Sequence, residues 1–288
     1  MEKTLLSLGH GFSGRALAAR LVPQGWCIVG TTRSTEKLAG IAKTGVEPLL
    51  WPGSDIAPLI AEFPNILVSA GPAQDGDPVL AQMHAALAEA APMMRWLGYL
   101  STTGVYGDHQ GGWVDETTPL NPSTKRGQAR IEAEAAWAAI PNLPLHIFRL
   151  AGIYGPGRGP FAKVRKGTAR RIIKEGQVFS RIHVEDIAQA LELSIAAPDP
   201  VSIYNLCDDD PAPPQDVIRH AAELLGLPIP PAVNFEDAEM TPMARSFYAE
   251  SKRVRNDHAK VALGWVPKYP DYRSGLAAML AADQALDD

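Results

Sequence analysis

Three glycines near the start of the chain have a spacing that suits close contact with phosphates. A short apolar run, Thr4–Leu8, is followed by Gly9, Gly11 and Gly14 as G-x-G-x-x-G, and then by an Ala/Leu-rich helical pattern. Gly9 permits a tight turn, Gly11 lets the backbone approach a ligand, and Gly14 lets the helix pack against the strand. The start of the helix offers free N–H groups and the positive end of a dipole. The pattern therefore predicts a loop that binds the pyrophosphate of a dinucleotide.

The residues expected to contact this cofactor lie in two places. Those in the loop include His10, whose position between two of the glycines predicts a place near a phosphate. Those at the end of the fourth predicted strand are small and are expected to use mainly their backbone. The predicted set is Gly9, His10, Gly11, Phe12, Ser13, Gly14, Ser69, Ala70 and Gly71.

The residues after the second predicted strand indicate which dinucleotide binds. Thr32, Arg33 and Ser34 follow the glycine loop by about 20 residues, where this type of fold reaches the adenosine ribose. An Asp or Glu there would favour NAD, but the first acid is Glu36. The Arg33 guanidinium suits a 2′-phosphate, and Ser34 adds a hydroxyl. We predict NADP rather than NAD; the alternative is that Arg33 is a solvated surface residue.

Strand and helix patterns alternate along the chain, which predicts an α/β fold: a Rossmann-type, doubly wound parallel sheet with a small C-terminal cap domain. The predicted strands are Thr4–Leu8, Cys27–Thr31, Val46–Leu50, Asn65–Ser69, Trp96–Ser101, Leu145–Leu150 and Ser202–Leu206. The predicted helices are Phe12–Leu21, Glu36–Ala42, Asp55–Glu62, Pro78–Ala91, Ser123–Ile140, Glu185–Ala196, Gln215–Leu225, Asp237–Phe247 and Tyr272–Ala285.

The alternation breaks after a Gly/Pro-rich stretch and again near Asp208. We therefore assign residues 1–155 and 182–206 to the dinucleotide-binding domain. Residues 156–181 and 207–288, here called the cap segments, are expected to form a small substrate domain over the carboxyl edge of the sheet. Ligands of open α/β sheets bind at that edge.

Composition narrows the class of protein. Hydrophobic residues make up 46% and charged residues 20%, which indicates a globular chain. A net charge of -5 without a long basic run argues against nucleic acid as a partner. Cys27 and Cys207 form no metal or redox motif and fit a reducing compartment as small buried side chains. No long apolar segment or signal peptide is visible, so we expect a cytoplasmic protein with no membrane and no metal.

Ser101–Asp108, which reads S-T-T-G-V-Y-G-D, follows the fifth predicted strand. It resembles the Ser/Thr-rich SS-x-x-VYG segment of the extended short-chain dehydrogenases/reductases, the NAD-dependent epimerase/dehydratase family. The other matching segments, Arg149–Gly157, Arg181–Ala188 and Tyr204–Leu206, follow in the family's order, and Ser251–Val254 with Leu263–Trp265 is similar to its short, atypical members. The resemblance covers nearly the whole chain, and it implies that Thr102 and Thr103 lie beside the nicotinamide. It also implies a possible homodimer.

The chain departs from this family at a pair of residues that moves protons. Typical members carry Tyr-x-x-x-Lys one helix after the Ser/Thr segment, and the matching positions here are Arg126 and Arg130. A phenol with a pKa near ~10 can exchange protons, whereas a guanidinium with a pKa above ~12 cannot. Arg130 could still donate to ribose hydroxyls, and Arg126 could bind an anionic substrate.

Tyr106 is the phenol that could replace the missing one. It lies just beyond Thr102 and Thr103 in the same segment, and these three are the predicted catalytic residues. The alternative is that Tyr106 is a packing residue whose hydroxyl binds the backbone. For His183, at a strand-to-helix junction, a structural role is the stronger interpretation.

A basic cluster that begins with Arg158 follows the Gly/Pro stretch and predicts recognition of an anionic substrate by Arg158, although it is also typical of a solvated loop. Two functions remain open. The first is an NADP-binding oxidoreductase or epimerase-like enzyme with altered catalytic residues, acting on a sugar-like or other small carbonyl substrate. The second is a non-catalytic NADP-binding sensor or a partner-binding module.

Overall fold

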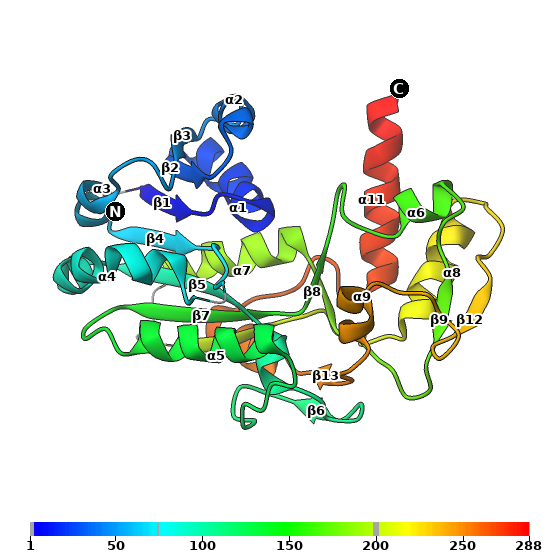
Figure 1. Cartoon of the computed structure of the whole chain (residues 1–288). Coiled ribbons are helices and arrows are strands. Elements are labelled where there is room, and N and C mark those ends of the chain that lie inside the picture. Colours follow the sequence, from blue (N-terminus) through cyan, green and yellow to red (C-terminus); the bar gives the residue numbers. More distant parts are fainter. Residues whose placement is uncertain (1–2, 74, 198–201, 288) are drawn as a thin grey trace.

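The computed structural model describes residues 3–73, 75–197 and 202–287 and has a seven-stranded parallel sheet at its centre (Figure 1). The strand order is β3-β2-β1-β4-β5-β7-β11, and every pair of neighbours is parallel. The strands are β1 (Thr4–Leu8), β2 (Cys27–Thr32), β3 (Glu47–Leu50), β4 (Asn65–Val68), β5 (Trp96–Thr102), β7 (Leu145–Leu150) and β11 (Ser202–Leu206). The order reverses at β1, so the ends of β1 and β4 form a ligand-binding edge.

Helices cover both faces of this sheet. They are α1 (Phe12–Leu21), α2 (Leu38–Ala42), α3 (Ala57–Glu62), α4 (Pro78–Ala90), α5 (Lys125–Ala138) and α7 (Val184–Ala196). Leu17 of α1 and Leu191 of α7 share one buried cluster with Trp96 of β5. On the opposite face, Leu87 of α4 and Trp137 of α5 share another cluster with strand side chains. The doubly wound α/β fold predicted from the alternation of patterns is confirmed.

The two cap segments pack on each other. Phe161 and Val164 of α6 (Phe161–Arg165) share a buried cluster with Val217 of α8 (Pro214–Leu224) and Leu276 of α11 (Tyr272–Asp287). Within them, β9 (Arg171–Ile173) pairs in parallel with β12 (Ala232–Asn234). At their border, β8 (Gly152–Tyr154) pairs in parallel with β10 (Arg181–His183). A third pair joins β6 (Trp113–Val114) to β13 (Arg253–Val254).

Some predictions in the cap segments need correction. The helix expected over Asp237–Phe247 is only α9 (Pro242–Phe247), because a proline can begin a helix but not continue one, and the Thr241 hydroxyl caps it by accepting from Ala244 N. The sequence patterns did not indicate α10 (Asp257–Leu263). Cys207 is buried as expected, but Cys27 is exposed at the start of β2.

Two kinds of feature are absent from the described ranges. Within residues 3–73, 75–197 and 202–287, none of the helices has the length and apolar character needed to cross a bilayer. Over the same residues, His, Cys, Asp and Glu side chains form no cluster that could hold a metal ion.

Candidate functional site

The glycine loop at the end of β1 has the geometry that a dinucleotide requires. Gly9 has φ +80°, and a Cβ at this position would lie 2.8 Å from Ala70 N, so only glycine fits. Gly11 is exposed, and the only atom within 4 Å of a Cβ there would be Gly9 O at 3.6 Å. No side chain caps α1, and its first turn holds no acid. The free amides at the start of α1 therefore fit a pyrophosphate.

His10 lies underneath this loop instead of on its ligand side. Its side chain is buried, Nδ1 lies 3.0 Å from Ser7 Oγ, and a Cβ at Gly30 would lie 2.7 Å from His10 Cγ. Burial lowers the pKa of His10 to about 4, so the ring is neutral at pH 7. The expectation that the imidazole lies near a phosphate is thus wrong, and His10 can meet a cofactor only through its backbone. Ser13 is also buried.

Arg33 stands free at the end of β2. It is exposed, and it makes no ion pair with any residue in the described ranges. The Thr32 hydroxyl accepts a hydrogen bond from Ser34 N at 3.2 Å, which shapes the turn. β2 pairs directly with β1, so Arg33 lies beside the end of the strand that carries the glycine loop.

The small residues after β4 contact both the glycine loop and α5. The Ser69 hydroxyl donates to Gly9 O at 2.7 Å. Gly71 faces Arg130, whose Nη2 would be 2.7 Å from a Cβ at Gly71. Arg130 Nη1 donates to Leu100 O at 2.7 Å and to the Tyr99 hydroxyl at 3.0 Å. The guanidinium of Arg130 is therefore fixed at the carboxyl ends of β4 and β5.

The Ser/Thr segment after β5 presents one hydroxyl and buries the rest. Thr102 is half-buried and its Oγ1 accepts from Gly104 N at 3.1 Å, whereas Thr103 is buried. Tyr106 is fully buried; its hydroxyl donates to Asn205 Oδ1 at 2.8 Å and accepts from Arg149 Nη1 at 3.0 Å. Burial raises the pKa of Tyr106. The prediction that Tyr106 donates a proton to substrate is therefore wrong, because its hydroxyl is inaccessible and already bonded.

A buried ion pair that sequence reasoning overlooked supports this segment. Arg149 Nη2 lies 2.7 Å from Glu134 Oε2, and Glu134 Oε1 accepts from the Ser101 hydroxyl at 2.5 Å. The network links β5, β7 and α5, and the Tyr106–Asn205 bond extends it to β11. Arg149 within the predicted buried strand Leu145–Leu150, whose other residues are apolar except for His146, was the sequence feature that could have indicated it.

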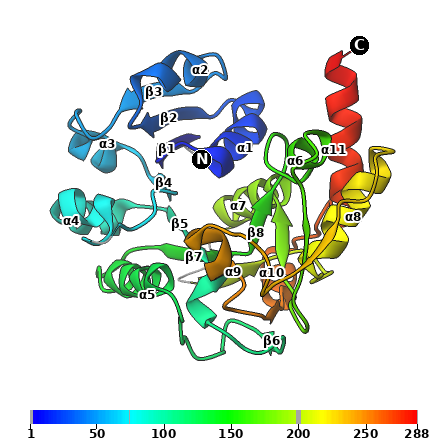
Figure 2. The same cartoon turned by 45° about the vertical axis from the view of Figure 1, so that its right-hand side comes forward.

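The segment that follows α9 lies against the start of α5, as Figure 2 shows. The Arg126 guanidinium lies 5.3 Å from the centre of the Phe247 ring, and the Ser123 hydroxyl donates to Glu250 Oε1 at 2.6 Å. Lys252 Nζ donates to Gly107 O at 2.7 Å and to Glu250 Oε2 at 2.6 Å. Residues 247–252 therefore lie against the start of α5 and against Gly107 in the segment after β5.

Sequence reasoning missed this segment as part of the site. Tyr248 and Lys252 have the spacing Tyr-x-x-x-Lys, which is a sequence feature that could have drawn attention to it. The two residues do not share a helix here, because α9 ends at Phe247.

Arg158 also lies elsewhere than expected. Its guanidinium is 5.7 Å from the centre of the Phe12 ring, the first residue of α1. A Cβ at Gly155 would lie 3.2 Å from Phe12 Cζ, so the turn that carries Arg158 contacts the glycine loop.

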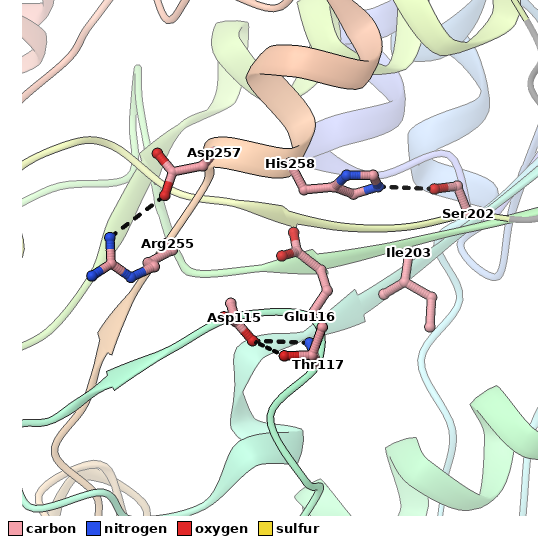
Figure 3. A pocket seen from close by; sticks show the side chains of 8 residues that line it. All are labelled: Asp115, Glu116, Thr117, Ser202, Ile203, Arg255, Asp257 and His258. Atoms are coloured by element: carbon pink, nitrogen blue, oxygen red, sulfur yellow. Dashed lines mark hydrogen bonds and ion pairs between the residues drawn. The ribbon is translucent and has the colours of Figure 1, made fainter.

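A separate pocket of about 460 Å³ lies at the β11 edge of the sheet (Figure 3). The pocket is lined by Asp115, Glu116, Thr117, Ser202, Ile203, Arg255, Asp257 and His258. None of these residues was predicted from the sequence to belong to the site. Glu116 Oε1 accepts from Asn205 N at 2.7 Å, so this carboxylate caps the open edge of β11.

The glycine loop at the strand-order reversal, with α1 behind it, defines a Rossmann-type nucleotide-binding protein. Comparison with family models narrows this class, since residues 8–207 match the NAD dependent epimerase/dehydratase family. The chain belongs to that family, which binds NAD(P).

Three similar proteins extend over different shares of the chain. Protein YeeZ of Escherichia coli K12 is 30% identical over 287 residues, 93% of this chain and 97% of YeeZ. The solved structure of a functionally unknown protein from Silicibacter pomeroyi is 60% identical with a TM-score of 0.94, covering 97% of this chain and 99% of that one. The 3-diazoavenalumate denitrifying reductase of a Streptomyces species is 30% identical over 177 residues, 57% of this chain and 55% of the reductase.

Proposed function

We propose that this protein is an NADP-dependent oxidoreductase that acts on a small carbonyl or sugar-like substrate carrying negative charge. The observation that carries the proposal is the open glycine loop with Arg33 beside it, an exposed residue that forms no ion pair within the described part of the chain. A permanent cation without a protein partner suits a 2′-phosphate, and no acid within the Thr32–Ser34 turn competes for it. The similarity to a reductase over 57% of the chain supports hydride transfer as the reaction class.

Arg130 takes the position of the family lysine. Two of its hydrogen bonds fix its guanidinium at the end of β5, and its Nη2 lies at Gly71. We assign Arg130 the role of donating hydrogen bonds to the nicotinamide ribose. This role needs a donor in a fixed position but no exchange of protons. Arg126, which is exposed and lies against Phe247, is assigned an anionic group of the substrate.

The proton donor in this proposal is Tyr248, because neither arginine can exchange a proton at pH 7 and Tyr106 is buried. Tyr248 is half-buried between Phe179 and Phe235, at ring-centre distances of 5.6 and 5.4 Å. Its hydroxyl has no hydrogen-bond partner among the residues that the structure describes. Burial raises the pKa of Tyr248 while the nearby Arg181 opposes the rise, so the phenol is protonated and faces a cation that can stabilise its anion.

When bound, the nicotinamide would supply the hydride that a carbonyl carbon gains in a reduction. The Tyr248 O–H bond breaks and its proton goes to the carbonyl oxygen, leaving a phenolate that recovers its proton from water. Thr102, half-exposed at the end of β5, hydrogen-bonds the same oxygen and orients it.

The first experiment is a titration of the purified protein with NADPH and with NADH, followed by ligand fluorescence. We expect binding of both, with NADPH tighter. The bound protein is then offered a panel of anionic aldehydes, ketones and nucleotide sugars while NADPH absorbance is recorded. Oxidation of NADPH that Tyr248→Phe abolishes and Tyr106→Phe spares would support the assigned roles, whereas the reverse pattern would contradict them.

The alternative is a non-catalytic NADP sensor or partner-binding module, favoured by the absence of the family's Tyr-x-x-x-Lys pair on α5. It requires tight dinucleotide binding without NADPH oxidation on any member of the panel, together with a partner protein that binds only the loaded form.

A further inference from the structure

The turn after β8 brings a cation to the glycine loop from the cap side. Gly155 and Arg158 exchange backbone hydrogen bonds, at 2.9 Å from Gly155 N to Arg158 O and 2.8 Å from Arg158 N to Gly155 O. Gly157 has φ +71°, which a tight turn of this kind requires. Gly155 is buried against Val184 and Phe12. The turn is therefore a fixed structure docked on the loop, and the position of Arg158 is set by its backbone.

The Arg158 side chain is exposed and makes no ion pair with any residue of the described ranges. Its guanidinium lies over the Phe12 ring, and Phe12 supplies the first backbone amide of α1. A guanidinium forms paired hydrogen bonds with phosphate oxygens. Arg15, in the same first turn of α1, is also exposed, and the site contains no acid in that turn.

We propose that Arg158 is a ligand of the dinucleotide pyrophosphate, contributed from the cap side of the glycine loop, and not a substrate-binding residue. The α1 amides and Arg158 would hold the pyrophosphate from two sides. Binding of the cofactor would then also tie the 155–158 turn to the dinucleotide-binding domain. This inference rests on the dinucleotide binding described under the proposed function, but it does not depend on which substrate is used or on whether the protein turns it over.

Binding measurements on separate pieces of the cofactor test this role. We expect Arg158→Ala to weaken NADPH, NADH and ADP-ribose alike, by roughly tenfold or more, because all three contain the pyrophosphate. Adenosine 2′-monophosphate lacks it and should bind the variant as it binds the natural protein. Arg158→Lys should recover part of the affinity, because it restores the charge without the paired donors.

Arg165 provides a matched control. It is also an exposed arginine over a phenylalanine, 5.6 Å from the Phe161 ring centre, but it lies on α6 and pairs with Asp283 at 3.0 Å. Arg165→Ala should leave all four dissociation constants unchanged. Thermal unfolding of the ligand-free variants shows whether either substitution disturbs the fold.

The outcomes separate the two proposals. If the natural protein binds NADPH and Arg158→Ala binds NADPH and ADP-ribose equally well, the assignment of Arg158 is overturned while the dinucleotide site stands. An equal loss for adenosine 2′-monophosphate would also overturn it, because the effect would then not be specific to the pyrophosphate. If the natural protein binds no dinucleotide at all, both proposals fail.

Discussion

At the scale of single residues, the place of a residue in a sequence motif does not determine whether its side chain is accessible. Tyr106 lies in a segment that carries catalytic groups in the resembled family, yet its hydroxyl is saturated by Asn205 and Arg149 in the interior. Tyr248 lies in a segment with no helical motif, and its hydroxyl is unbonded among the described residues. The same functional group is buried and hydrogen-bonded at Tyr106, and half-buried at Tyr248.

These two tyrosines give a paired prediction. Tyr106→Phe should lower the free energy of unfolding by about 1–3 kcal/mol, because it leaves buried donors and acceptors on Arg149 and Asn205 without a partner. Tyr248→Phe should change it by less than about 0.5 kcal/mol, since no hydrogen bond is lost. Urea unfolding followed by tryptophan fluorescence measures both. A larger loss for Tyr248→Phe would show that its hydroxyl is structural.

Arg33 carries the predicted cofactor preference. Arg33→Ala should weaken NADPH binding by roughly 1–3 kcal/mol through loss of a charge-assisted contact and should leave NADH binding nearly unchanged. The dissociation constants of NADPH and NADH for Arg33→Ala and for the natural protein, measured at one ionic strength, test this prediction. An equal loss for both dinucleotides would mean that Arg33 acts on the loop's structure and not on the 2′-phosphate.

At the scale of secondary-structure elements, close backbone contacts place α5 against the segment after β5. A Cβ at Gly127, in the first turn of α5, would lie 2.7 Å from Pro122 Cβ and 2.8 Å from Gly104 O. The absence of a side chain there lets Arg130 reach Leu100 O and Gly71 from the same helix. The geometry of the site therefore depends on the close approach of α5 to the segment after β5 as well as on the arginines of α5.

Two glycine substitutions test this packing. Gly127→Ala should destabilise the fold by about 1–3 kcal/mol and weaken dinucleotide binding, because α5 must shift away from Gly104. Gly40→Ala, in α2 with nothing within 4 Å of the new Cβ, should instead stabilise by about 0.5–1 kcal/mol through helix propensity. Chemical denaturation and NADPH titration of both variants give the comparison. Equal effects would indicate that contact at Gly127 is unimportant.

At the scale of the whole molecule, Asp208 lies just after β11, where the chain leaves the central sheet, and its backbone N–H donates to Arg181 O at 2.6 Å. Asp208 is 1% exposed, and neither carboxyl oxygen has a hydrogen-bond partner among the described residues. Burial raises the pKa of Asp208 to about 8; Arg181 opposes the rise and Asp210 adds to it. A protonated, neutral carboxyl at Asp208 avoids the free-energy cost of burying a charge that has no hydrogen-bond partner.

This shift predicts a pH dependence of stability. Between about pH 4 and pH 8 the folded chain keeps a proton on Asp208 that the unfolded chain releases, so a rise in pH favours unfolding. Asp208→Asn removes this effect, and its stability relative to the natural protein should increase by several kcal/mol in total as pH rises through that range. Asp257→Asn, whose side chain is 72% exposed, is the control and should show no comparable trend. A constant difference between Asp208→Asn and the natural protein would rule out the raised pKa.

Local sequence patterns were enough to predict the doubly wound sheet, the glycine loop and the position of Arg33 after β2. Each rests on neighbours in the chain: alternating apolar periods, glycines at fixed offsets, and a residue directly after a strand. The helix predicted over residues 237–247 was too long. The helical pattern of the sequence continues across Pro242, but α9 begins at this proline. The short helix α10 (Asp257–Leu263) was not predicted at all from these patterns.

Tertiary structure alone decided which of the candidate groups are accessible and which segments meet. His10 and Tyr106 are turned inward, Arg158 lies at the glycine loop, and Phe247 contacts Arg126 at the start of α5 across more than a hundred residues of chain. The physical reason is that burial and long-range contact depend on how layers pack, and residue types and local spacing do not encode that directly. A loop suited to a dinucleotide could therefore be found in the sequence, but the side chains that lie around that loop could be identified only in the fold.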